Sequence, residues 1–311
     1  MSASNPTERP SSPLDGILNI DKEADWTSHD VVARIRRIAR MKRVGHAGTL
    51  DPAAVGVLPV CLGQATRVVE YLSSTGKAYR ATITFGVETN TYDAEGEIVT
   101  QQPVPSTLDR AAIETILPQF LGEIQQVPPI YSALKRDGKR LYELARAGVE
   151  VEIPARPVRI DALTIIAWNA PTLVLDVACG KGTYIRSLAH DLGAVFGCGA
   201  HLAALIRTRV GPFVRRNSIT LAALAEAFAN DTWREHLFAP DEALLDLQAI
   251  ILAETNEHRL RQGQLLHLPA AQIGASIVRA YSTDGRFLGL VAHQPPDGWH
   301  PEKVFQVQPV E

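Results

Sequence analysis

The segment from Val44 to Thr66, VGHAGTLDPAAVGVLPVCLGQAT, contains a single carboxylate, that of Asp51. An aspartate before a proline commonly begins a turn, and this is one role open to Asp51. Three nearby glycines, at positions 45, 48 and 56, let the backbone approach a ligand closely. The apolar run 55–62 predicts a buried strand, which would form a low-dielectric wall beside the acid. If Asp51 is buried and ionised there, it needs a cation nearby in space.

Other common chemistries have no support in the sequence. A two-carboxylate glycosidase needs a second acid about 5–9.5 Å away, but Asp51 is the only acid between Asp30 and Glu70, so a partner would have to come from elsewhere in the fold. GKGT at 180–183 lacks the upstream glycine of a P-loop, and no GxGxxG, HExxH or GxSxG motif occurs. Cysteines occur only at 61, 179 and 198, with no CxxC pair. We therefore expect neither a metal site nor disulfides, and a reducing, cytoplasmic location.

Positive charge is concentrated locally, although the formal net charge of the 311-residue chain is −3. Residues 34–43 include six Lys or Arg and no acid, and residues 207–216 include four Arg and no acid. A third basic stretch, within residues 124–155, also carries Tyr131 and Tyr142. Each patch alone is typical of a solvated surface, but three patches with interleaved aromatic rings favour RNA loops or single strands. A lone carboxylate in that setting suits chemistry at the glycosidic carbon of a nucleoside.

Mixed strands and helices must position these residues. Alternation and turn residues predict strands over 16–22, 77–86 and 172–180. Helices are expected over 27–40, where Thr27 and Asp30 form a capping box, from residue 106 to about Gly122, and over 183–197. There is no regular βαβ alternation, so we predict an α+β fold with a mixed, mainly antiparallel sheet flanked by helices.

Changes in composition along the chain predict its domains. The Pro/Ser-rich residues 1–12 are expected to be disordered. Residues 13–245 would form the main domain, with an insertion at about 124–155 bounded by prolines that suits a mobile lid. Residues 246–311 contain short apolar runs and an STDG hairpin turn at 282–285, and predict a small, mostly β domain. No apolar run approaches 18 residues, so no membrane span is expected.

Five ordered segments resemble motifs of the bacterial TruB-type tRNA pseudouridine synthases. VGHAGTLDPAAVGVLPVCLGQATRV resembles the catalytic aspartate motif of that family, and KAYRATITFGVETNTYDAEGEIV its tyrosine motif. QVPPIYSALKRDGKRLYELARAG resembles its RNA-gripping insertion. GKGTYIRSLAHDLG resembles its arginine motif, and GCGAHLAALIRTRVGPF the segment that follows. The tail from Asp246 resembles the PUA-like RNA-binding domain of the family only loosely.

The resemblance implies an isomerase that converts uridine 55 of the tRNA T-loop to pseudouridine by base flipping, without cofactor or metal. The partner would be the T-arm of tRNA, with no guide RNA and no membrane, and we expect a monomer. Asp51 would be the essential acid, acting at C1′ or C2′ of the ribose. Tyr79 would stack on the flipped uracil and help to remove its C5 proton, and Arg186 would keep Asp51 ionised.

Four further positions carry over as contacts to the substrate. His46 and Asp93 would help to hold the extruded loop, Tyr184 would pack beside the target base, and Lys22 would contact RNA. Three positions depart from the family pattern: Asn90 where Asp is common, Gly180 where Ser is frequent, and Ile206 where Arg is common. These departures concern affinity for RNA rather than the three central roles.

Three alternatives stay open at this stage. A guide-RNA-dependent pseudouridine synthase shares the aspartate motif, but the bacterial-type insertion DGKRLYELARAG argues against it. An RNA-binding or RNA-folding module could retain the same fold without turnover. A hydrolase that cuts the N-glycosidic bond would release free uracil.

Overall fold

The computed structural model describes residues 14–130, 135–136, 139–140, 153–268, 274–295 and 298–306. Residues 1–12, which were predicted to be disordered, lie outside the described residues. So do Tyr131 and Tyr142 of the predicted RNA-gripping insertion.

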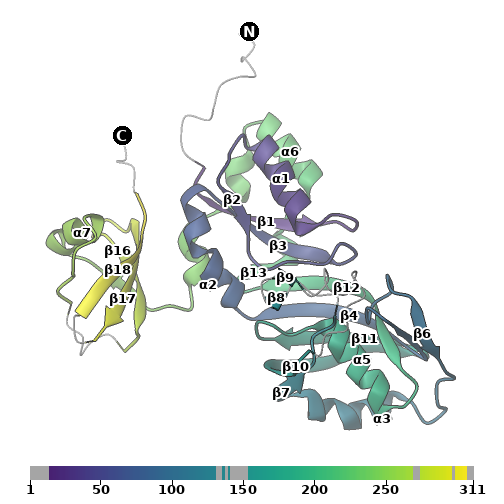
Figure 1. Cartoon of the computed structure of the whole chain (residues 1–311). Coiled ribbons are helices and arrows are strands. Elements are labelled where there is room, and N and C mark those ends of the chain that lie inside the picture. The colour runs from purple at the N-terminus through teal and green to yellow at the C-terminus, as the bar shows by residue number, and fades with distance from the viewer. Residues whose placement is uncertain are drawn as a thin grey trace.

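A ten-stranded mixed sheet forms the centre of the protein (Figure 1). Its pairs are antiparallel except for β3 with β12, which run parallel, as the sequence predicts for a mixed, mainly antiparallel sheet. The eight strands of the main path, in spatial order, are β14 (Leu237–Phe238), β1 (Gly16–Lys22), β3 (Val55–Leu62), β12 (Ala200–Val210), β4 (Lys77–Phe85), β11 (Thr172–Cys179), β10 (Arg156–Asn169) and β7 (Gly122–Gln126). The other two are β2 (Val44–His46), which pairs with β3, and β13 (Phe213–Val214), which pairs with β12.

Helices cover the two ends of this sheet separately (Figure 1). At one end, α1 (Ser28–Ile38) and α6 (Leu221–Ala229) share a core with β1 and β3. At the other end, α5 (Ile185–Val195) and α3 (Arg110–Ile116) pack on β4 and β11. The predicted capping box of α1 is present, and its apolar stripe is buried. All six basic residues of 34–43 are exposed on the other side of this segment.

Shorter elements connect these layers. The single turn α2 (Val69–Ser74) follows β3. The 3-10 turns are Gly63–Val68, Leu117–Phe120, Arg215–Asn217, Trp233–His236 and Pro240–Leu244. Two small antiparallel pairs stand outside the main sheet: β5 (Val87–Thr89) with β6 (Ile98–Gln101), and β8 (Lys135–Arg136) with β9 (Lys139–Arg140).

The helix predicted from residue 106 to about Gly122 is wrong in its extent. The α-helix begins after Asp109, which caps it by accepting a hydrogen bond from the amide of Ala112 at 2.8 Å, and it ends at Ile116. Pro118 lacks the amide hydrogen that would continue the helix, so the chain tightens into a 3-10 turn. Gly122, at φ +81°, then turns the chain into β7.

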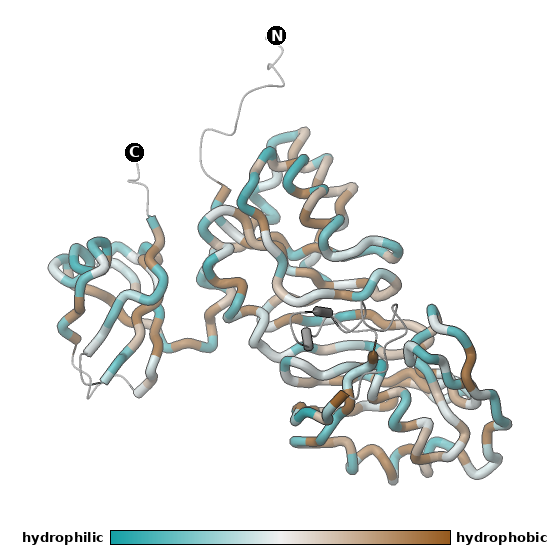
Figure 2. The backbone as a smooth tube through the Cα atoms, in the orientation of Figure 1, coloured by the Kyte–Doolittle hydropathy of each residue, from teal (hydrophilic) through white to brown (hydrophobic). Residues whose placement is uncertain are grey.

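The C-terminal part forms its own four-stranded sheet, as predicted for a mostly β region. It consists of β15 (Ala249–Ile251), β16 (Ile277–Tyr281), β17 (Phe287–Gln294) and β18 (Gly298–Val304), with α7 (Glu254–Arg261) beside it. The predicted turn at 282–285 joins β16 to β17, which pair antiparallel. This sheet is attached to the first one through Leu290 and Phe305, which join the core around Ile17 and Cys61. Figure 2 shows that α7, on its outer side, is largely hydrophilic.

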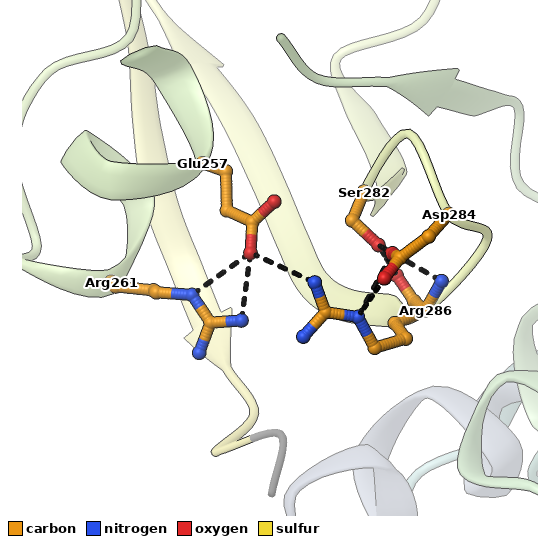
Figure 3. A network of polar contacts seen from close by, with 5 residues as sticks. All are labelled: Glu257, Arg261, Ser282, Asp284 and Arg286. Carbon is orange, nitrogen blue, oxygen red and sulfur yellow. Dashed lines mark hydrogen bonds and ion pairs between the residues drawn. The ribbon is translucent and has the colours of Figure 1, made fainter. Parts of the chain in front are cut away.

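An ion-pair network ties α7 to the β16–β17 turn (Figure 3). Glu257 lies 2.8 Å from Arg261 and 3.6 Å from Arg286. Arg286 also contacts Asp284 at 2.7 Å, and Asp284 accepts a hydrogen bond from the Ser282 hydroxyl. The Arg286 and Ser282 contacts lower the pKa of Asp284 to about 2. No helix of the described residues is both long enough and apolar enough to span a membrane.

Candidate active site

The Asp51 carboxylate lies on the loop between β2 and β3, opposite the first turn of α5. Its Oδ2 atom is 3.1 Å from Nη2 of Arg186, and Nη1 of Arg186 is 3.3 Å from Oδ2 of Asp93. The Arg186 side chain is 9% exposed and that of Asp51 45% exposed. The structure thus brings together three of the predicted site residues from three distant segments. Arg186 orients the Asp51 carboxylate, which is half-exposed rather than buried and therefore open to a substrate.

A hairpin presents Asp93 to this arginine. Oδ1 of Asp93 accepts hydrogen bonds from the Thr91 hydroxyl at 2.5 Å and from the Glu95 amide at 3.1 Å, so Oδ2 is directed at Arg186. Asn90 closes the same turn, since its side-chain oxygen accepts from the Glu97 amide at 3.1 Å. Asn90 is therefore a turn residue here, and this structural role suits an amide as well as a carboxylate.

A second contact holds the hairpin against α5. The ring of Tyr92 stacks on His190 at 4.0 Å between centroids. His190 also lies 3.0 Å from Glu88 and 3.2 Å from Asp191. The hydrogen bond to Asp191 raises the pKa of His190, against the opposing effect of burial and with further help from Glu88. These residues were not predicted, and nothing in their spacing marks them.

The backbone of the Asp51 loop is held by buried side chains. The Ser28 hydroxyl accepts a hydrogen bond from the Leu50 amide at 2.9 Å and donates to the Leu50 carbonyl at 3.2 Å. Nζ of Lys22 donates to the carbonyls of Glu23 at 2.9 Å, Trp26 at 2.7 Å and Pro52 at 2.9 Å.

Lys22 corrects the prediction made from sequence. It was expected to contact RNA, but it is fully buried, and its ammonium group is occupied by backbone carbonyls beside Asp51. Burial lowers the pKa of Lys22, and the nearby charge of Asp51 opposes this effect. A buried ammonium can stabilise the loop but cannot reach a phosphate at the surface.

Tyr79 lies in the middle of β4 and is only 8% exposed. It faces Arg207 of β12 directly across the antiparallel pair. Burial raises the pKa of the Tyr79 phenol, while the positive charge of Arg207 works in the opposite direction. Arg207 was predicted to belong to a basic surface patch, and this is wrong, because the side chain is 1% exposed.

The remaining predicted residues surround this centre. His46 ends β2, and its ring meets His29 edge-on at 5.5 Å. Burial, followed by the charge of His29, lowers the pKa of His46. Tyr184 caps α5, and its backbone amide and carbonyl bind the side chain of Gln126 at 2.8 and 3.0 Å. Gln126 thereby holds the end of β7 beside the N-terminus of α5. The sequence did not predict this contact.

The donor set at this centre is suited to acid–base and electrostatic work. The described residues contain no group of three or more His, Cys, Asp or Glu placed to hold a metal ion. What they do provide is a half-exposed carboxylate, a guanidinium that orients it, and a buried phenol beside a second guanidinium.

Comparisons with known proteins identify the family of the chain. Residues 36–185 match the model of the "TruB family pseudouridylate synthase (N terminal domain)", and residues 186–261 match the "tRNA pseudouridylate synthase B C-terminal domain". A tRNA pseudouridine synthase B of Nostoc sp. is 47% identical over 281 residues, covering 89% of this chain and 94% of that protein. One from Synechocystis sp. is 47% identical over 287 residues, covering 91% and 95%.

Solved structures show the same fold. A chain from a Cbf5-Nop10-Gar1 complex superimposes with a TM-score of 0.75 at 28% identity, covering 94% of this chain and 85% of that chain. A chain from an H/ACA RNP bound to a substrate RNA containing 2'-deoxyuridine superimposes with a TM-score of 0.72 at 25% identity, covering 94% of this chain and 86% of that chain. Two consecutive family models and relatives close to half identical over nearly the whole chain establish that the protein belongs to the TruB family of pseudouridylate synthases.

Proposed function

We propose that this protein converts uridine 55 in the T-loop of tRNA to pseudouridine. Its family consists of isomerases of uridine in RNA, and its relatives of 43–47% identity are named tRNA pseudouridine synthase B. The observation that carries the catalytic assignment is the Asp51–Arg186 pair at 3.1 Å, with Asp51 still 45% exposed. The carboxylate is thereby oriented yet accessible to a nucleotide.

The reaction breaks the bond between C1′ and N1 and forms a bond between C1′ and C5. The proton lost from C5 is balanced by one gained at N1, so no external reactant is required. Asp51 acts on the ribose, by attack at C1′ or by proton abstraction at C2′. Arg186 fixes the orientation of Asp51 and stabilises its charge, as expected for a preorganised electrostatic site. Tyr79 stacks on the extruded uracil and assists removal of the C5 proton.

Recognition of tRNA combines stacking with phosphate contacts. Flipping a base out of its stack costs a few kcal/mol, and stacking on a ring returns about 1–3 kcal/mol. We assign His46 and Asp93 to holding the extruded loop, and Tyr184 to packing beside the target base. The exposed cations of residues 34–43 offer phosphate contacts, which make binding weaker as salt increases.

We assign the remaining properties on the same basis. The enzyme acts as a monomer without guide RNA, metal or cofactor. Its three cysteines are free and buried, which suits the cytoplasm, where we place it. Residues 13–245 act as the catalytic domain and 246–311 as a PUA-like RNA-binding domain.

One experiment tests the reaction and its main alternatives. The purified protein is incubated with an unmodified tRNA transcript and no guide RNA, and pseudouridine is mapped at nucleotide resolution. We expect a single modified site at uridine 55. The Asp51→Asn variant should bind the same tRNA and form no pseudouridine, which rules out a defect in folding. Release of free uracil would identify a hydrolase, and turnover that depends on a guide RNA would identify the other branch of the family.

A further inference from the structure

Arg207 is a buried cation that donates hydrogen bonds to three backbone carbonyls. Its Nε donates to Val57 at 2.7 Å, Nη2 to Gly48 at 3.0 Å and Nη1 to Thr49 at 3.3 Å. Only 1% of the residue is exposed. Charge-assisted hydrogen bonds in a low-dielectric interior are stronger than those between neutral groups. Arg207 therefore joins three carbonyls into one rigid unit.

These carbonyls belong to the segment that presents Asp51. Gly48 and Thr49 lie just before the catalytic residue, and Val57 lies in the strand that follows it. Two glycines make the approach possible. A Cβ on Gly56, at φ +102°, would lie 2.3 Å from the Arg207 carbonyl oxygen. Gly48, at φ +82°, has a backbone conformation that other residues rarely adopt, although a Cβ there would make only an ordinary contact with Nη1 at 3.5 Å.

The same guanidinium lies next to the second group assigned to the reaction. Arg207 and Tyr79 are direct partners in the β12–β4 register, so their side chains occupy the same face of the sheet. Tyr79 is buried, and burial raises the pKa of its phenol. Among the charges around Tyr79, Arg207 contributes most to counteracting this rise.

We propose that Arg207 is a positioning residue for the reaction, which holds the Asp51 loop by its carbonyls and places a positive charge beside the Tyr79 hydroxyl. This inference rests on the proposed function, which assigns Asp51 and Tyr79 to catalysis. It gives the guanidinium a different task from Arg186, because Arg186 contacts the carboxylate itself whereas Arg207 acts through the backbone and through Tyr79.

The test compares Arg207→Lys and Arg207→Met with Arg209→Met. Arg209 is a matched control, since it lies on the same strand but is partly exposed and donates to the nearby Gly211 carbonyl at 3.3 Å. For each variant, thermal unfolding, the Kd for tRNA and the single-turnover rate at saturating tRNA are measured. We expect Arg207→Met to keep its Kd within about threefold and to lower the rate by about a hundredfold, as expected for a small misplacement of catalytic groups. Arg207→Lys keeps the positive charge but not the several N–H donors of the planar guanidinium, so we expect its single-turnover rate to fall by about tenfold.

A second measurement separates positioning from mere support of the fold. In a Tyr79→Phe background, Arg207→Met should lower the rate by no more than about threefold further, because coupled residues are not additive. Three outcomes would overturn the inference and show that Arg207 serves stability alone. They are a further hundredfold fall in the rate when Arg207→Met is added to Tyr79→Phe, a wild-type rate in Arg207→Lys, and failure of both Arg207 variants to fold. If the wild-type protein itself forms no pseudouridine, the proposed function fails instead.

Discussion

Arg186 reaches Asp51 at 3.1 Å from α5, a helix that shares one hydrophobic core with Leu50 and Ala54 of the Asp51 loop. The helix is fixed by Leu188 and Leu192 in the core and by the Ser187 hydroxyl, which donates to the Val127 carbonyl at 2.7 Å. The loop is fixed from the other side by Lys22, Ser28 and Arg207. Packing and hydrogen bonds on both sides of the pair therefore set the distance between the two charges. Such preorganisation avoids reorganisation at the moment of reaction.

Replacing Arg186 by Met is expected to abolish most turnover while leaving tRNA binding largely intact. The change leaves Asp51 and Asp93 facing each other without their shared cation. We expect the single-turnover rate to fall by at least about a hundredfold, in line with losses of one electrostatic group in active sites. Arg80→Met is the control, because Arg80 pairs with Asp176 at 2.8 Å but is 45% exposed on the outside of β4. An Arg186→Met enzyme as fast as Arg80→Met would contradict the role of the pair.

Lys22→Met should destabilise the protein rather than weaken its contacts with phosphate. The substitution removes the ammonium donor from the carbonyls of Glu23, Trp26 and Pro52, although Pro52 still accepts from the Asp25 amide at 3.1 Å. An acceptor left unsatisfied in the interior costs about 1–3 kcal/mol. We expect the free energy of unfolding to fall by about 2–4 kcal/mol, since part of this loss is relieved by relaxation. The dependence of tRNA affinity on salt should not change. Arg37→Gln, on the exposed side of α1, should leave the free energy of unfolding unchanged. It should reduce the slope of the logarithm of the tRNA binding constant against the logarithm of salt concentration by about one.

His190 should make the hairpin of residues 87–101 sensitive to pH. Its pKa is raised by the hydrogen bond to Asp191 and by the charge of Glu88. The folded protein thus binds a proton more tightly than the unfolded chain, so the stabilisation is present below about pH 6.5 and is lost as the pH rises through the folded pKa. NMR titration of the ring should show a pKa above 6.5. After division by the intrinsic, base-catalysed exchange rate, the protection of the hairpin amides should fall across the same range in the wild type but not in His190→Gln.

Gly193→Ala should be destabilising, although alanine favours helices. A Cβ at this position of α5 would lie 2.1 Å from the amide nitrogen of Ala200 in β12, where rigid backbone cannot give way. We expect a loss of about 1–3 kcal/mol, typical of overpacking, together with reduced turnover because Arg186 is on the same helix. Gly180→Ala is the matched control, since its Cβ would meet only ordinary contacts at 3.6 Å or more. Equal melting temperatures for the two variants would refute the close approach of α5 to β12.

Local patterns in the sequence determined much of the fold. The bounds of β1, the capping box of α1, and the strands β4 and β11 follow from alternation and capping residues within short windows. Asp51 could also be singled out, because a lone carboxylate among glycines and apolar residues is visible without coordinates. The helix predicted from residue 106 to about Gly122 was too long, because Pro118 interrupts its hydrogen bonding.

Only the tertiary structure decided where the cations lie. In the sequence, Lys22 and Arg207 look like surface charges that could bind RNA, yet both are buried and hold backbone carbonyls of the Asp51 loop. Register shifts near Leu202 and Arg207 break the alternation of β12, so no periodic signal marked Arg207 as inward-facing. The partner of a charged side chain depends on which distant segments pack together, and patterns within a short stretch of sequence do not determine that packing.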